Sequence, residues 1–122
     1  MKRASILAVA AVLAVPGHSR ADTNDQLAAK VIALVEVGAS VVEANRNDCN
    51  AMGDTLSRMV ADNAAFIDDV RARSEKVTPS EMRTLTARYQ SRVEAAMAKA
   101  KPGLDRCKSN AKVAAVLRKL GQ

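Results

Sequence analysis

The sequence predicts an all-α protein: an up-and-down four-helix bundle, stapled by one disulfide and preceded by a cleaved signal peptide. Apolar residues recur at spacings of three and four, and no strand-like alternation of any length occurs. Clusters of turn and capping residues divide residues 22–122 into four such segments. Two cysteines, Cys49 and Cys107, are placed at one end of the bundle by the order of these segments.

Residues 1–21 have the features of an export signal. Two basic residues precede an apolar run at residues 4–15, which Pro-Gly then ends. Ser19 and Ala21 place small side chains at the −3 and −1 positions of a cleavage site, so we expect cleavage between Ala21 and Asp22. The apolar run is too short to span a bilayer.

Removal of this segment leaves residues 22–122 as a single helical domain, because a chain of this length forms one core. We expect the protein to be exported, either to a periplasm or to the medium, and not to span a membrane. The domain is poor in aromatic residues, so its core must be built from small aliphatic side chains on closely packed helices.

The first two helices are separated by a run of turn residues. Residues 45–48, Asn-Arg-Asn-Asp, end the first helix, and Asn47 or Asp48 caps the second. Gly38 lies within the first helix, where it permits a close approach by a neighbour. The expected helices are residues 23–44 and 49–74.

The third helix has the clearest start signal in the chain. Thr78 is its N-cap, Pro79 occupies the first helical position, and Glu81 completes a capping box. Lys-Pro-Gly at residues 101–103 is expected to stop it. The third and fourth helices are therefore expected at residues 79–100 and 104–120. Four methionines are expected to face inward: Met52, Met59, Met82 and Met97.

Cys49 and Cys107 are expected to form a structural disulfide. In an oxidising compartment two lone cysteines pair, and closing a loop of this length stabilises a chain by about 4 kcal/mol. Short connections make consecutive helices antiparallel, so the second and fourth helices start at the same end. In a square bundle these two helices are diagonal, so one must lean inward for the cysteines to meet.

The domain has no recognisable catalytic, cofactor or metal site. The single histidine, His18, lies in the signal segment, and the cysteines do not form C-x-x-C. One S-x-x-K match, Ser109 to Lys112, lacks the motifs that accompany it in enzymes. We therefore predict no catalytic residues, no cofactor, no metal and no enzyme activity.

Charge is divided unevenly along the domain. Residues 22–70 carry three basic and nine acidic residues, whereas residues 71–122 carry thirteen basic and four acidic ones. Arg88, Arg92 and Lys99 fall on one face of the third helix. This candidate basic face could bind an acidic protein, an acidic polymer or an anionic membrane surface. Alternatively, these cations pair with the acids of the first two helices. Export and the scarcity of aromatic residues disfavour nucleic acid.

Residues 77–90 resemble the periplasmic chaperones of the Spy and CpxP type. The similar stretch is Val-Thr-Pro-Ser-Glu-Met followed by Leu-Thr-Ala-Arg-Tyr-Gln, where that family has an L-T-x-x-Q motif. Tyr89 stands at the glutamine position, and Gln90 follows one residue later. The main prediction is an exported, non-enzymatic interaction or structural module with a basic C-terminal hairpin. The resemblance implies the alternative, a periplasmic chaperone that shields hydrophobic clients.

Overall fold

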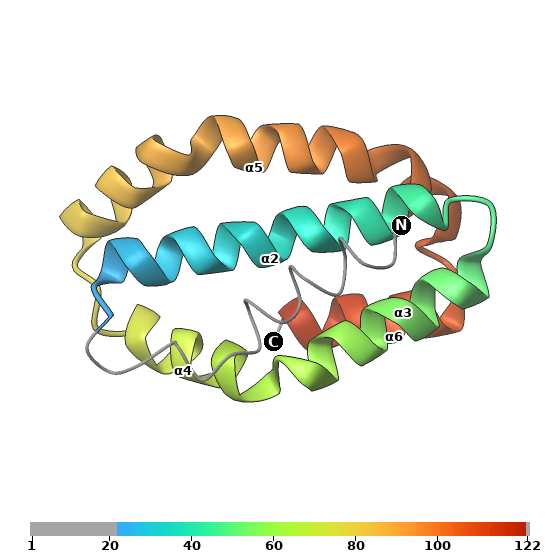
Figure 1. Ribbon diagram of the computed structural model, residues 1–122, viewed down its shortest axis with the longest axis horizontal. Helices are drawn as coiled ribbons and strands as arrows, with labels where there is room; N and C mark the ends of the chain where they lie inside the picture. Colours follow the sequence, from blue (N-terminus) through green and yellow to red (C-terminus); the bar gives the residue numbers. More distant parts are fainter. Residues whose placement is uncertain (1–21, 122) are drawn as a thin grey trace, which may run out of the picture.

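A computed structural model describes residues 22–121, and this part of the chain is all-helical, as the sequence predicted. The expected signal segment, residues 1–21 with its last residue Ala21, lies outside the described residues. Figure 1 shows the arrangement of the helices. They are α2 (Asn24–Ala44), α3 (Cys49–Asp62), α4 (Ala64–Ser74), α5 (Pro79–Cys107) and α6 (Ala111–Gly121).

The start of α2 is a complete capping box. The Oγ1 of Thr23 accepts from the backbone N–H of Gln26 at 3.1 Å, and the backbone N–H of Thr23 donates to Gln26 Oε1 at 2.8 Å. Asn45 closes the other end, where its Nδ2 donates to the carbonyl of Val41. Asp48 caps α3 by accepting from the backbone N–H of Ala51 at 3.0 Å.

The predicted helix at residues 49–74 is interrupted, which corrects the sequence-based boundaries. Asn63 lies between α3 and α4, and its side-chain Nδ2 donates to the carbonyl of Met59 at 2.8 Å. Asparagine competes in this way with the hydrogen bonds of a helical backbone. The second arm of the protein therefore consists of two helices, and α4 can take a direction different from that of α3.

The predicted stop at residues 101–103 is wrong, because α5 continues through Pro102 and Gly103 to Cys107. Gly103 is buried, and a Cβ at this position would lie 2.7 Å from Val42 Cγ1. This close packing against α2 outweighs the local preference of proline and glycine to end a helix.

The last helix starts later than predicted, at Ala111. Asn110 precedes it, and its Oδ1 accepts from the backbone N–H groups of Lys112 and Val113 at 3.0 and 3.2 Å. Cys107 consequently belongs to the end of α5 and not to the last helix.

The start of α5 departs from the expected capping box in one respect. Thr78 caps the helix as predicted, accepting from the backbone N–H of Glu81 at 3.1 Å. The carboxylate of Glu81 accepts instead from Asn24 Nδ2 of α2. This bond joins the starts of α2 and α5, which lie side by side in Figure 1.

The closest helix pairs run in the same direction. α2 packs against α5, and α3 packs against α6, with each pair parallel in Figure 1. In a square up-and-down bundle such helices would be diagonal. Because α2 lies between α5 and the other helices, every one of its residues from 28 to 38 is half-buried.

The well-packed core lies toward the end of the molecule that holds the disulfide. It joins the second half of α2, α3, the second half of α5, and α6. We call this the closed end. Its buried apolar residues are Ala39, Val41, Val42, Met52, Leu56, Val60, Ala96, Ala100, Cys107, Val113 and Val116.

The opposite end, which we call the open end, is formed by the first halves of α2 and α5 together with α4. Leu27 and Phe66 are the buried apolar residues outside the closed-end core among residues 22–121. Met52 is fully buried, whereas Met97 is 52% exposed, so the inward placement predicted for Met97 is wrong. Met82 faces α2 and α4 but remains 43% exposed. In the second half of α5, the buried residues Ala96 and Ala100 pack in the closed-end core, whereas the first half of α5 has no buried residue.

Candidate functional site

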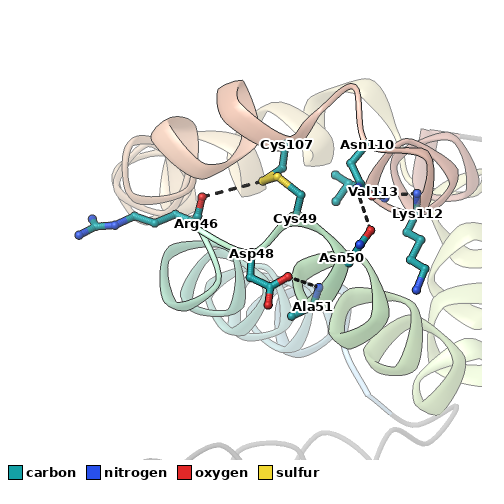
Figure 2. Close-up of a disulfide and its surroundings, with 9 residues drawn as sticks. All are labelled: Arg46, Asp48, Cys49, Asn50, Ala51, Cys107, Asn110, Lys112 and Val113. Atoms are coloured by element: carbon teal, nitrogen blue, oxygen red, sulfur yellow. Dashed lines mark hydrogen bonds between the residues drawn. A yellow bond between two sulfur atoms is a disulfide. The ribbon is translucent and has the colours of Figure 1, made fainter.

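The disulfide joins the start of α3 to the end of α5. Cys49 and Cys107 are bonded, with their Cα atoms 5.2 Å apart, and Figure 2 shows the bond with its surroundings. Cys107 is fully buried. Next to the disulfide, Asn110 Nδ2 donates to Asn50 Oδ1 at 3.0 Å, which links the start of α6 to α3. The disulfide therefore links α3 to α5 at the closed end.

Each residue of the candidate basic face contacts a polar side chain of α2. Arg88 pairs with Asp25, and Arg92 pairs with Glu36. Lys99 Nζ lies 3.8 Å from Glu43 Oε1 and 3.2 Å from Ser40 Oγ. All four partners are on α2. The three basic residues thus form a seam between α2 and α5, with their charges engaged within the protein.

The pair of Arg92 and Glu36 is joined by two hydrogen bonds, and it shifts the pKa of both groups. The hydrogen bonds from Arg92 lower the pKa of Glu36, with smaller contributions from the charges of Arg92 and Lys99 and an opposing one from burial. The hydrogen bond to Glu36 raises the pKa of Arg92. Both side chains are more than one-third exposed, so solvent weakens the attraction.

The open end contains an apolar cavity of about 340 Å³, which we call the open-end cavity. It lies between α2, α4 and α5, and its walls are almost entirely apolar. The main contributors are Leu27, Val31, Val70, Met82, Leu85 and Val93.

A second apolar cavity, also about 340 Å³, lies farther along α2, between α2, α3, α4 and α6, and Leu104 of α5 also lines it. We call it the central cavity. Val31 and Val70 line both cavities, so the two adjoin at these side chains. Leu117 and Leu120 of α6 line the central cavity and are more than one-third exposed.

Two polar side chains of the open-end cavity are notable. Arg73 lines it, and its Nη2 donates to Asn24 Oδ1 at 3.1 Å, whereas its Nη1 is buried without an acceptor among residues 22–121. Tyr89 also lines it and donates its hydroxyl to Asp25 Oδ1 at 3.1 Å. Burial is the main reason that the pKa of Tyr89 is raised, and the hydrogen bond to Asp25 adds to the effect.

Sequence reasoning missed Arg73 as a site residue, although a signal was present. Val70, Arg73 and Val77 recur at spacings of three and four, so the arginine lies within an apolar stripe. An arginine in such a stripe places a permanent charge beside apolar walls. The sequence gives no sign of the cavity itself. Residue spacing shows which side chains share a helix face, but not whether another helix covers that face.

Within the part of the chain that the structure describes, no group of three or more His, Cys, Asp or Glu residues could hold a metal ion. None of the helices in this part is both long enough and apolar enough to cross a membrane. The chain matches no protein-family model, no curated protein and no solved structure. The site is therefore interpreted from its own geometry.

Proposed function

We propose that this is an exported, non-catalytic binding protein that holds an apolar ligand in the open-end cavity. The cavity itself carries the proposal. Ligand pockets occupy about 300–1,000 Å³, are mostly apolar and present a few polar groups. The open-end cavity has this size and composition, with Arg73 and Tyr89 among its polar residues. Arginine stays protonated, and the raised pKa of Tyr89 keeps its hydroxyl a donor to Asp25, so the proposal is binding without catalysis.

The proposed fold of the exported domain, residues 22–122, is an up-and-down arrangement of four arms. In this description α3 and α4 form one interrupted arm between α2 and α5. The paired cysteines support an oxidising compartment, and the composition of residues 1–21 supports export to a periplasm or to the medium.

Export has a direct test. Mass spectrometry of the protein recovered outside the cytoplasm should find an N-terminus at Asp22, because Ser19 and Ala21 fit the cleavage site. Recovery of the intact chain from Met1 in the cytoplasm alone would contradict the proposal.

The candidate basic face receives less support as a binding surface. Its three cations are engaged by acids of α2, so an acidic protein, an acidic polymer or an anionic membrane would have to displace these contacts. Displacing an existing ion pair leaves an acid of α2 without its partner, which offsets much of the gain.

A second candidate function is the chaperone that the resemblance at residues 77–90 implies. The observation in its favour is that the two cavities adjoin at Val31 and Val70 and follow one another along α2. Such a pair of cavities could receive an apolar segment of an unfolded protein. The two functions differ in ligand size, and the experiment below separates them.

An uncharged fluorescent dye, N-phenyl-1-naphthylamine, tests the proposed function. We expect the folded protein to bind it, and Ala28→Phe to weaken binding at least about tenfold by filling the cavity that Ala28 lines. Ala87→Phe is the matched control, because Ala87 is exposed on α5 and does not line either cavity. Circular dichroism establishes that each variant is folded.

Absence of dye binding, or equal binding by the two phenylalanine variants, would contradict the proposed function. The chaperone is tested in parallel by light scattering from a reduced, aggregating client protein. Suppression of aggregation that Ala28→Phe removes, with no dye bound by the parent protein, would favour the chaperone instead.

A further inference from the structure

We propose that the ligand of the open-end cavity is a single-chain anionic lipid of the fatty-acid class, with its carboxylate bound by Arg73. This inference rests on the proposed function and adds the chemical class of the ligand. It depends on three observations: the size of the cavity, the nature of its walls, and the incomplete hydrogen bonding of Arg73.

The size and walls of the cavity fit one acyl chain. At about 340 Å³ the open-end cavity is at the lower end of the range for ligand pockets, which suits a single chain better than a two-chain lipid. Because its walls are mostly apolar, they favour the hydrocarbon part of a ligand. The central cavity continues beyond Val31 and Val70, so a longer chain has apolar surface to extend into.

Arg73 supplies the charge that such a ligand needs. A guanidinium stays protonated in proteins and carries five N–H donors. Arg73 is half-buried and makes no ion pair among residues 22–121; its polar partner there is the amide of Asn24. A partly buried charge without a counter-ion is costly, and a buried donor without an acceptor adds to that cost. A carboxylate at Nη1 would remove both costs at once.

The neighbouring arginine, Arg71, has backbone acceptors within the protein. Arg71, two positions earlier on α4, donates from Nη2 to the carbonyls of Lys119 and Leu120 at 2.9 and 3.2 Å. It thereby satisfies the C-terminal carbonyls of α6. Arg71 thus has acceptors on α6, whereas Nη1 of Arg73 has none among the described residues.

The acids near the cavity are already engaged, so they do not replace an anionic ligand at Arg73. Glu94 lines the cavity and accepts from Gln90 Nε2 at 2.9 Å. Glu81 accepts from Asn24 Nδ2, so the amide of Asn24 stands between this carboxylate and Arg73. Asn24 thereby holds the guanidinium in place with its other atom, Oδ1.

The test compares dodecanoic acid with dodecanol, which has the same chain and no charge. Each displaces N-phenyl-1-naphthylamine from the purified protein, at a pH where the acid is ionised and below its micelle concentration. We expect the parent protein to bind the acid at least about tenfold more tightly than the alcohol, as a charge-assisted hydrogen bond predicts. Arg73→Met should abolish this preference, because the affinity for the acid should fall at least about tenfold more than the affinity for the alcohol or the dye.

Two further variants sharpen the comparison. Arg73→Lys keeps the charge but loses the planar pair of donors, so it should retain part of the preference for the acid. Arg83→Met is the matched control, since Arg83 is exposed on α5 and lines neither cavity. It should retain the full preference.

The outcomes distinguish this inference from the proposed function. Equal affinity of the parent for acid and alcohol, with the dye bound, would overturn the role of Arg73 and leave the apolar cavity in place. Equal weakening of acid, alcohol and dye by Arg73→Met would assign Arg73 a purely structural role. If the parent binds neither dye nor alcohol, the proposed function and this inference both fail.

Discussion

Arg92 on α5 and Glu36 on α2 form a two-point ion pair, with Nη2 at 2.5 Å from Oε1 and Nε at 3.1 Å from Oε2. The planar guanidinium matches the carboxylate in this geometry, which fixes the relative register of the two helices. Arg88 and Lys99 make the corresponding contacts on either side. Together with Lys112, which pairs with Asp54, these residues connect the basic second half of the sequence to the acidic first half.

Replacing Arg88, Arg92 and Lys99 together by glutamine should lower the melting temperature. Each exposed pair is worth under about 1 kcal/mol, so the combined effect is modest. Added salt should destabilise the parent more than the variant, since salt screens these pairs. Thermal unfolding at low and high salt measures both effects.

The matched control for the charge change replaces three other exposed basic residues by glutamine: Arg83, Lys108 and Arg118. This variant loses the same net charge without touching the seam. If it melts as early as the first variant, net charge and not pairing is the cause, and the structural role of the seam is wrong.

Acid should weaken the contact between α2 and α5 through Glu36. The hydrogen bonds of Arg92 lower the pKa of Glu36 in the folded protein below its unfolded value. The stabilisation is therefore present above the usual glutamate pKa and is lost as pH falls through the lowered, folded value. Carboxyl NMR titration should show the lowered pKa of Glu36 and its return toward the usual value in Arg92→Gln. An unchanged pKa in that variant would refute the assignment.

Gly103 and Gly38 should respond in opposite ways to alanine. At Gly103 the added Cβ would lie 2.7 Å from Val42 Cγ1 and 2.9 Å from Val42 O, so Gly103→Ala should destabilise the protein by about 1–3 kcal/mol. At Gly38 the nearest atom is the flexible Cε of Met59 at 3.4 Å. Gly38→Ala should be neutral or stabilise by up to about 1 kcal/mol, because alanine favours helix. Denaturant unfolding compares them, and equal effects would argue against the close contact of α5 with α2.

Replacing either cysteine should lower the stability of the protein by about the same amount. A closed loop of 58 positions contributes roughly 4 kcal/mol in the chain-entropy account. Cys49→Ser and Cys107→Ser should lower the melting temperature alike, and the double variant should be no less stable than either single variant, since one cross-link is lost in each case. Free thiols in the native protein would be incompatible with this account.

Local signals predicted the features that local chemistry determines. The cap at Thr78, the end of the first helix at Ala44 and the pairing of Cys49 with Cys107 follow from residue type and spacing. The continuation of α5 through Pro102 does not, because it depends on the packing of Gly103 against a residue 61 positions earlier, Val42.

The candidate site was less accessible to sequence reasoning than the fold. The seam residues were identified, but their partners on α2 depend on which helices are close neighbours. The break at Asn63 was not predicted either. An asparagine within a helical pattern can bond to the backbone, as Asn63 does, or point to solvent, and the sequence does not distinguish the two. Without that break, neither the direction of α4 nor the two cavities that it lines can be derived.

Parallel pairing of the helices has a consequence for how the protein folds. The contacts that join α2 to α5 and α3 to α6 connect residues between 56 and 64 positions apart. In a bundle of antiparallel hairpins, helices that are adjacent in the sequence pack together. In this chain long loops must close before the main contacts form. We therefore expect slow folding for an all-helical protein of this length. During synthesis α2 is complete long before α5 exists, so the first half of the chain has no finished fold to adopt until the second half is present.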